Sequence, residues 1–253
     1  MICLHNNIPL ASVPELVERL TVTDLQSDDH LAVDSPPTSD AIAVIGGTGA
    51  LGRALARRWA IEGLTVHIGS RSAESAEVAA ASLPGAQGAG YAAAVRHCST
   101  VVLTVPFSAH LHVVRTLADL LQPGQVLIDT TVPMTASSRR GLRPVTPFAG
   151  SAAQQAQDLL PDGVHVVSAL HTVSAAMLDD PDHPLDEDVL VFGDHRPSLQ
   201  TAMRLIGHIH GLRPIDAGSL DLSRVCEQLT PLIIGVNRRY KTHAGIKLTG
   251  LRN

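Results

Sequence analysis

The sequence predicts an α/β protein with a Rossmann-type, doubly wound parallel sheet and a smaller C-terminal α+β cap domain. Short apolar runs alternate with helical segments from residue 41 onward, the connections between them are short, and a glycine-rich turn follows the first run. A strand buried on both faces reads as a continuous apolar run. Strands that alternate with helices form a parallel sheet with helices on both faces, which gives the fold class.

The regular alternation occupies the first part of the chain. Strands are predicted at 41–45, 65–69, 100–105 and 125–129, and helices at 49–62, 72–83 and 109–121. Leu51, Leu55 and Trp59 repeat at four-residue spacing and so mark one face of the first helix. Gly63 stands where a C-terminal helix cap belongs, and Ser72 is a suitable N-terminal cap for the second helix.

After about residue 130 the alternation loosens. Residues 133–150 are rich in Pro, Ser and Arg and are predicted to form a loop. Beyond them we expect helices at 152–160, 197–210 and 219–240, strands at 165–169 and 189–192, and an acidic, turn-rich segment at 179–188. The predicted parts are an N-terminal extension at 1–40, partly disordered but with one short helix at 14–20, a nucleotide-binding domain at 41–165, and a C-terminal substrate and dimerisation domain at 166–253.

Composition excludes several classes of function. A net charge of −5 without a basic stripe argues against nucleic-acid binding, and no apolar run approaches the ~20 residues that span a bilayer. The three cysteines are far apart and predict neither disulfides nor a zinc site, and the thirteen histidines include no H-E-x-x-H pattern. We therefore expect a soluble cytoplasmic protein that binds small molecules and holds no metal.

A phosphate-binding turn follows the first predicted strand. Gly47, Thr48, Gly49, Ala50, Leu51 and Gly52 form a G-x-G-x-x-G pattern that opens a predicted helix. In this context Gly47 is expected to allow the tight turn, Gly49 to let a diphosphate approach the backbone, and Gly52 to let helix and strand pack closely. The N–H groups at the helix start would then bind the phosphates.

The choice between NAD and NADP is predicted from the end of the second strand. An NAD site places Asp or Glu there, on the ribose 2′-hydroxyl. This chain has Ser70 and Arg71 at that point and no carboxylate. A guanidinium and hydroxyls would hold the 2′-phosphate of NADP, so Ser70, Arg71 and Thr48 are the expected selecting residues. The alternative is that Arg71 is only an exposed arginine at a helix start.

Several segments resemble the NADPH:coenzyme F420 oxidoreductase family, whose members pass a hydride between NADP and a deazaflavin. The similar segments are 42–52, 69–71, 102–107, 167–172, 211–218 and 229–233, and together they extend over roughly residues 41–250. Those outside the nucleotide site are more specific than a Rossmann fingerprint. Residues 129–131 and 72–75 depart from the family pattern, and 1–40 have no counterpart in it.

The resemblance implies NADP(H) and coenzyme F420 as redox partners, and a homodimer that pairs through the C-terminal domain. It places Val105 and Pro106 at the nicotinamide. The residues that it places at the second ring are Val132, Pro133, Leu170, His171, Leu229, Thr230 and Pro231. His171 is the expected catalytic residue, because it could hydrogen-bond the deazaflavin as charge develops there. The alternative is that His171 is a structural histidine satisfied by backbone groups.

Other functions remain open at the level of sequence. An NADPH-dependent reductase of an imine, a ketone or an activated alkene could use the same fold, and so could a non-catalytic NADP-sensing module. The β-hydroxyacid dehydrogenases share the Rossmann start but use a lysine in the middle of the chain. Here the only lysines are Lys241 and Lys247, which argues against that group. The cytosolic domain of a membrane metalloreductase is disfavoured because the chain has no membrane segment.

Overall fold

The computed structural model describes residues 40–137 and 141–251. The predicted extension at 1–40, with its helix at 14–20, therefore lies outside the described residues except for Asp40. All the described residues belong to one compact unit. Among them, no helix is both long enough and apolar enough to cross a membrane.

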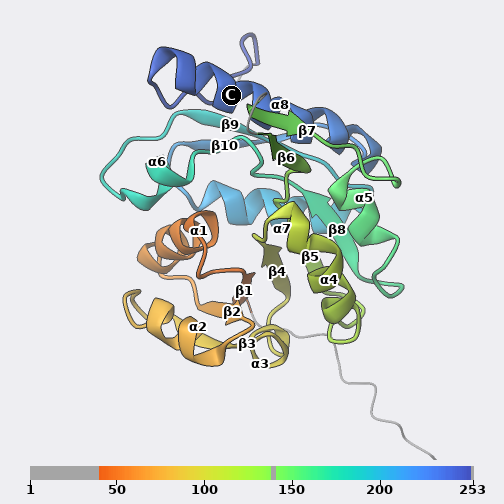
Figure 1. Cartoon of the computed structure of the whole chain (residues 1–253). Coiled ribbons are helices and arrows are strands. Elements are labelled where there is room, and N and C mark those ends of the chain that lie inside the picture. The colour runs from red at the N-terminus through yellow and green to blue at the C-terminus, as the bar shows by residue number, and fades with distance from the viewer. Residues whose placement is uncertain (1–39, 138–140, 252–253) are drawn as a thin grey trace, which may run out of the picture. The chain divides into compact units, whose positions relative to one another are not determined.

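A six-stranded sheet forms the centre of this unit (Figure 1). Its strands are β1 (Ile42–Ile45), β2 (Val66–Ser70), β3 (Gln87–Gly90), β4 (Thr100–Leu103), β5 (Val126–Asp129) and β8 (His165–Ser168), in the order β3-β2-β1-β4-β5-β8. Every neighbouring pair is parallel. The strand order reverses beside β1, so the carboxyl ends of β1 and β4 enclose the crevice in which such sheets bind ligands.

Helices cover both faces of the sheet, as the doubly wound prediction requires. They are α1 (Ala50–Ile61), α2 (Ala73–Ala80), α3 (Tyr91–Val95), α4 (Phe107–Ala118), α5 (Ala152–Gln157) and α7 (Arg196–Gly207). Alternate residues of β1 point to opposite faces. Ile42 and Val44 join a core cluster with α1, α2 and α7, whereas Ala43 and Ile45 join a second cluster with α3, α4 and α5. The predicted fold class is confirmed.

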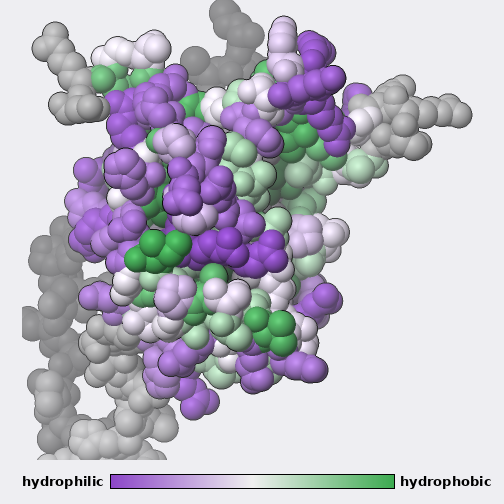
Figure 2. Space-filling model, turned by 90° about the vertical axis from the view of Figure 1, so that its left-hand side faces the viewer, coloured by the Kyte–Doolittle hydropathy of each residue, from purple (hydrophilic) through white to green (hydrophobic). Residues whose placement is uncertain are grey.

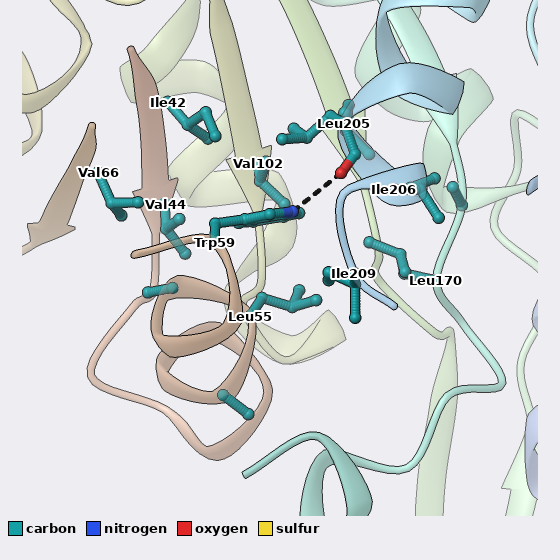
Figure 3. Packing of buried hydrophobic residues seen from close by; sticks show 14 of the residues in the cluster. Ile42, Val44, Leu55, Trp59, Val66, Val102, Leu170, Leu205, Ile206 and Ile209 are labelled. Carbon is teal, nitrogen blue, oxygen red and sulfur yellow. Dashed lines mark hydrogen bonds between the residues drawn. The ribbon is translucent and has the colours of Figure 1, made fainter. Parts of the chain in front are cut away.

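The first core cluster joins α1 to α7 through the single tryptophan. Trp59 is fully buried, and its indole Nε1 donates a hydrogen bond of 3.0 Å to the carbonyl of Leu205 (Figure 3). Leu170, Ile206 and Ile209 belong to the same cluster and lie on the Leu205 side of the indole. A buried indole N–H needs such a partner, so this bond fixes where α7 lies against α1.

The remaining elements lie beyond the six strands. They are the hairpin of β6 (Met134–Ser137) and β7 (Gly141–Pro144), α6 (Ala175–Asp179), the parallel pair β9 (Glu187–Val191) and β10 (Leu212–Asp216), the short 3₁₀ helix η2 (Leu220–Leu222), and α8 (Ser223–Tyr240). Helix α8 contacts β7 and crosses the top of the view in Figure 1.

Several sequence predictions are corrected by these elements. The loop predicted at 133–150 is wrong, because residues on both sides of 138–140 pair as the β6–β7 hairpin. The short elements β3, α3, α6 and β10 were not predicted. The expected boundary between 165 and 166 falls inside β8, which pairs with β5 as the sixth strand of the sheet. The division into two domains at that point remains a prediction.

Candidate functional site: a nucleotide pocket and a buried polar network

The glycine-rich turn joins β1 to α1 with a left-handed residue at Gly46. Its φ is +85°, and a Cβ there would lie 2.9 Å from the carbonyl oxygen of Thr104. The tight turn was predicted at Gly47, and this role belongs to Gly46 instead. Gly47 is required for packing, since a Cβ at that position would lie 2.9 Å from Cγ2 of Ile68.

Of the other two glycines, Gly52 has the packing role that was predicted, and the approach of a diphosphate to Gly49 stays a prediction. A Cβ at Gly52 would lie 2.4 Å from Oγ1 of Thr104 and 2.7 Å from the Gly46 carbonyl oxygen, so glycine allows α1 to pack on the sheet. A Cβ at Gly49 would meet only that carbonyl oxygen, at 3.2 Å. Gly49 is exposed, no side chain caps the start of α1, and its first turn holds no acid. This helix start fits a diphosphate.

A pocket of about 220 Å³ lies beside this helix start. Six of the residues predicted for the cofactor line it: Thr48, Gly49, Ser70, Arg71, Val105 and Pro106. The other four, Gly47, Ala50, Leu51 and Gly52, belong to the same turn or the start of α1 but do not line this pocket. The structure therefore brings the glycine-rich turn and the end of β2 together around one pocket.

The pocket also contains residues that the sequence analysis missed. They are Gly46, Tyr91, Thr104, Ala109, His112 and Val113. Tyr91 was missed because β3 was not predicted, so nothing placed the next residue at the sheet edge. Ala109, His112 and Val113 are spaced by three and four residues on α4, a pattern that could have marked one helix face toward the ligand.

The wall at the end of β2 has the chemistry of a 2′-phosphate site. Arg71 is exposed and follows Ser70, the last residue of β2. Ser72 caps α2, as predicted, by accepting a hydrogen bond of 3.2 Å from the N–H of Ser75. The residues that line this pocket include no Asp or Glu. An acid there would repel a phosphate, whereas a guanidinium attracts one.

The residues predicted for the second ring follow the carboxyl ends of β5 and β8 or lie on α8. Val132 is partly exposed and Pro133 is buried, just after the end of β5. On α8, Leu229 and Pro231 are partly exposed and Thr230 is buried. The Thr230 hydroxyl donates a hydrogen bond of 2.9 Å to the carbonyl of His171, which joins α8 to the segment after β8.

Leu170 and His171 turn the chain sharply after β8. Leu170 has a φ of +65°, and its side chain is 1% exposed in the core, which leaves it no surface for a substrate (Figure 3). His171 is also buried. Its Nε2 lies 3.1 Å from the hydroxyl of Ser168, and its Nδ1 has no hydrogen-bond partner among the described residues. Burial lowers the pKa of His171 to about 4, so its imidazole is neutral near pH 7.

A buried ionisable pair lies next to these residues and was not predicted. Asp129, the last residue of β5, is 2.7 Å from Nε2 of His110 on α4 and accepts a hydrogen bond of 2.9 Å from the N–H of Thr131. Burial favours a raised pKa for Asp129, but His110 and Thr131 together hold the pKa below its usual value. The Gln155 amide lies 3.1 Å from the other ring nitrogen of His110.

A second buried acid, Glu227 on α8, interacts electrostatically with Asp129 and His110. Both of its carboxylate oxygens accept from the N–H of Ala152 at 3.0 Å, and one also accepts from Ala153 at 3.3 Å. Burial raises the pKa of Glu227 to about 7, against the effect of the Ala152 hydrogen bond. The acid therefore holds the start of α5 against α8, and its charge is sensitive to pH near neutrality.

Comparison with known proteins gives the family. Residues 41–133 match the model described as "NADP oxidoreductase coenzyme F420-dependent". The F420-dependent NADP reductase of Methanothermobacter thermautotrophicus is 38% identical over 221 residues, which are 83% of this chain and 95% of that protein. The chain belongs to the F420-dependent NADP reductase family. The reductase of Methanocaldococcus jannaschii, also of this family, is 35% identical over 225 residues and is covered to 98%.

Solved structures agree with this membership of the F420-dependent NADP reductase family. A candidate F420-dependent NADP-reductase from Arthrobacter sp. FB24 superposes with a TM-score of 0.69 and 25% identity, covering 80% of this chain and 95% of that one. An imine reductase from Bacillus cereus superposes with a TM-score of 0.57 and 17% identity, covering 79% of this chain and 63% of that one. The second similarity reflects the shared fold alone.

Proposed function

We propose that this protein transfers a hydride between NADP(H) and coenzyme F420, a deazaflavin. The names of its relatives support both partners. The observation that supports NADP in this chain is the acid-free pocket that joins the open start of α1 to Arg71 at the end of β2. NADP in this pocket would have its diphosphate at the backbone of Gly49 and its 2′-phosphate at Arg71 and Ser70.

The protein's part in this reaction is to position two rings and to exclude water. The bound nicotinamide and deazaflavin supply the hydride chemistry themselves. Val105 and Pro106 lie in the same pocket as Arg71 and guide the dinucleotide along the end of β4 toward β5. Val132, Pro133 and the α8 residues at 229–231 form the proposed surface for the second ring. Fixed geometry of this kind removes much of the entropic barrier to transfer.

The test of this function is a spectroscopic assay with purified coenzyme F420. NADPH should reduce F420 and bleach its visible band, and NADH should do so far more slowly. A panel of imines, ketones and activated alkenes is measured beside it under the same conditions. Turnover of a panel compound without any change in F420 would indicate an NADPH-dependent reductase of that compound instead. Binding of NADPH without turnover of any acceptor would indicate a cofactor-sensing protein.

We also propose that two copies of the chain pair through α8. Large apolar side chains are exposed on this helix and just before it: Leu222, Val225, Leu232 and Tyr240. Phe148, which follows β7, is fully exposed as well. In Figure 2, hydrophilic residues dominate the centre of the face shown, and hydrophobic surface increases toward its upper right edge. Exposed apolar groups on one helix are typical of a symmetric interface.

We propose a cytoplasmic location as well, because the free, buried cysteines Cys98 and Cys226 fit a reducing compartment.

Sedimentation tests this pairing. Leu232→Glu should convert the dimer to a monomer, because each copy of a symmetric interface would bury an unpaired charge. Val78→Glu is the matched control, since Val78 is equally apolar and 71% exposed but lies on α2. A wild-type protein that sediments as a monomer at micromolar concentration would refute the pairing.

A further inference from the structure

Tyr91 lies directly beside Arg71 at the carboxyl edge of the sheet. The parallel register of β2 and β3 pairs Ser70 with Gly90, so the next residue of each strand leaves the sheet at the same point. These next residues are Arg71 and Tyr91, and both line the nucleotide pocket. The position at the end of β2 is the one that contacts the adenosine ribose in this fold.

The aromatic ring of Tyr91 packs over the end of β2. A Cβ built at Gly69 would lie 3.6 Å from Cδ1 of Tyr91, so the ring lies on the side of β2 that this glycine leaves without a side chain. Burial raises the pKa of the Tyr91 hydroxyl, and the Arg71 charge acts to lower it, so the two side-chain ends are electrostatically coupled. His112 and Val113 of α4 line the same pocket from the β4 side of the crevice.

We propose that Tyr91 is a specificity residue for the adenosine end of the cofactor, with its hydroxyl donating to the 2′-phosphate beside Arg71 and its ring forming one wall for adenine. This inference rests on the proposed use of NADP. The pocket offers the exposed guanidinium of Arg71 at the end of β2, and Ser70 and Tyr91, which carry hydroxyls, line the same pocket. A phenol donates well to a dianionic phosphate, and its ring presents a flat apolar surface to a base.

Two substitutions of Tyr91 test the role of its hydroxyl and the role of its ring separately. Tyr91→Phe removes the hydroxyl and keeps the ring that packs over Gly69, so the fold and the adenine wall remain. Tyr91→Leu removes both. The matched control is Tyr240→Phe, because Tyr240 is the other tyrosine of the chain and is 70% exposed at the end of α8.

Calorimetry on the full chain measures these variants with adenosine 2′,5′-bisphosphate and 5′-AMP, two probes without a nicotinamide. Tyr91→Phe should weaken the bisphosphate about tenfold or more and leave 5′-AMP within about twofold, as expected for one hydrogen bond to a charged group. Tyr91→Leu should weaken both probes, and Tyr240→Phe neither. In Tyr91→Phe the unchanged affinity for 5′-AMP reports that the variant is folded, and circular dichroism reports it for Tyr91→Leu.

Two results in Tyr91→Phe overturn the inference while the proposed function stands. One is an unchanged bisphosphate affinity in Tyr91→Phe, and the other is an equal loss for both probes in that variant. A wild-type chain that binds NADP⁺ and 5′-AMP but shows no preference for the bisphosphate would also overturn it. Failure of the wild-type chain to bind NADP⁺ at all would instead reject the proposed function, and the inference with it.

Discussion

The turn after β8 stores backbone strain next to the proposed site of the second ring. Leu170 adopts a left-handed conformation that costs a non-glycine residue on the order of 1 kcal/mol. Burial of its side chain among Ile206 and Ile209 offsets that cost (Figure 3). The turn brings His171 back toward Ser168, and Thr230 holds the His171 carbonyl from α8. Such a constrained turn suits a side chain that must be held in one orientation.

His171→Ala should slow hydride transfer about tenfold or more while leaving the affinity for NADPH unchanged. Its Nδ1 is buried without a hydrogen-bond partner among the described residues, and the lowered pKa keeps the ring neutral, so the wild-type rate should show no titration of this group between pH 5.5 and 8. Single-turnover kinetics with bound NADPH measures both effects. His210→Ala, at an exposed histidine, is the control. An unchanged rate in His171→Ala would give this residue a structural role only.

At the scale of elements, α1 contacts the end of α6 through arginines, of which Arg58 makes the buried hydrogen bonds. The buried Arg58 guanidinium donates to the carbonyls of Leu178 at 2.9 Å, Met177 at 3.1 Å and Pro181 at 3.1 Å. These carbonyls lie at the C-terminal end of α6, where a helix leaves its acceptors unpaired. The planar guanidinium of Arg58 therefore pairs with the carbonyl groups at the end of α6 and holds α6 against α1.

Arg58→Lys should lower the free energy of unfolding by about 2–4 kcal/mol, because a lysine ammonium cannot reach several carbonyls in one plane. Chemical denaturation monitored by circular dichroism measures the change. Arg53→Lys on the same helix is the control, since Arg53 is 46% exposed and lies 3.8 Å from Asp179 in a weak surface pair. Equal, small losses in both variants would contradict this account of α6.

The sequence predicted the elements whose residues show a strong apolar pattern. The strand β4, Thr-Val-Val-Leu, is buried on both faces and was predicted within two residues. The edge strand β3, Gln-Gly-Ala-Gly, has no such pattern, and its first glycine makes room for a neighbouring helix. A Cβ at Gly88 would lie 2.2 Å from the backbone of Ala76. Whether a strand position must be glycine depends on the helix that packs against it, so this requirement cannot be predicted from the strand's own residues.

At the scale of the whole described unit, buried acids connect parts of the chain that are far apart in sequence. Asp129 and His110 join β5 to α4, and Glu227 joins α8 to the start of α5. Thr48, Gly49, Ser70 and Arg71 of the pocket beside α1 could be predicted because they belong to a local motif. The buried acids and their partners could not be predicted, because each is an ordinary polar residue in the sequence. They come together only when the sheet and α8 have formed.

Glu227 predicts a pH-dependent stability. Its pKa rises from 4.5 to about 7 on folding, so its contribution is fully present below pH 4.5 and is lost as pH rises through 7. His171 acts in the opposite direction, since its lowered pKa costs stability as pH falls from 6.5 toward 4. Comparison of wild type with Glu227→Gln isolates the first effect from the second.

The stability advantage of wild type over Glu227→Gln should be larger at pH 5 than at pH 8 by about 1 kcal/mol or more. Thermal unfolding at the two pH values measures it. Glu77→Gln, at an exposed position on α2, should show no such difference. A stability advantage that is constant, or larger at pH 8, would mean that folding does not raise the pKa of the Glu227 carboxyl.

The central claim is that one site lets a hydride pass directly from NADPH to coenzyme F420. It is tested by giving the enzyme NADPH deuterated at one or the other face of nicotinamide C4 and measuring the mass of the reduced F420. Direct transfer between two held rings predicts that one deuterated form gives reduced F420 heavier by a single deuterium, and that the other gives unlabelled product. Reduced F420 without deuterium from either form, or no reduction at all, would contradict the account.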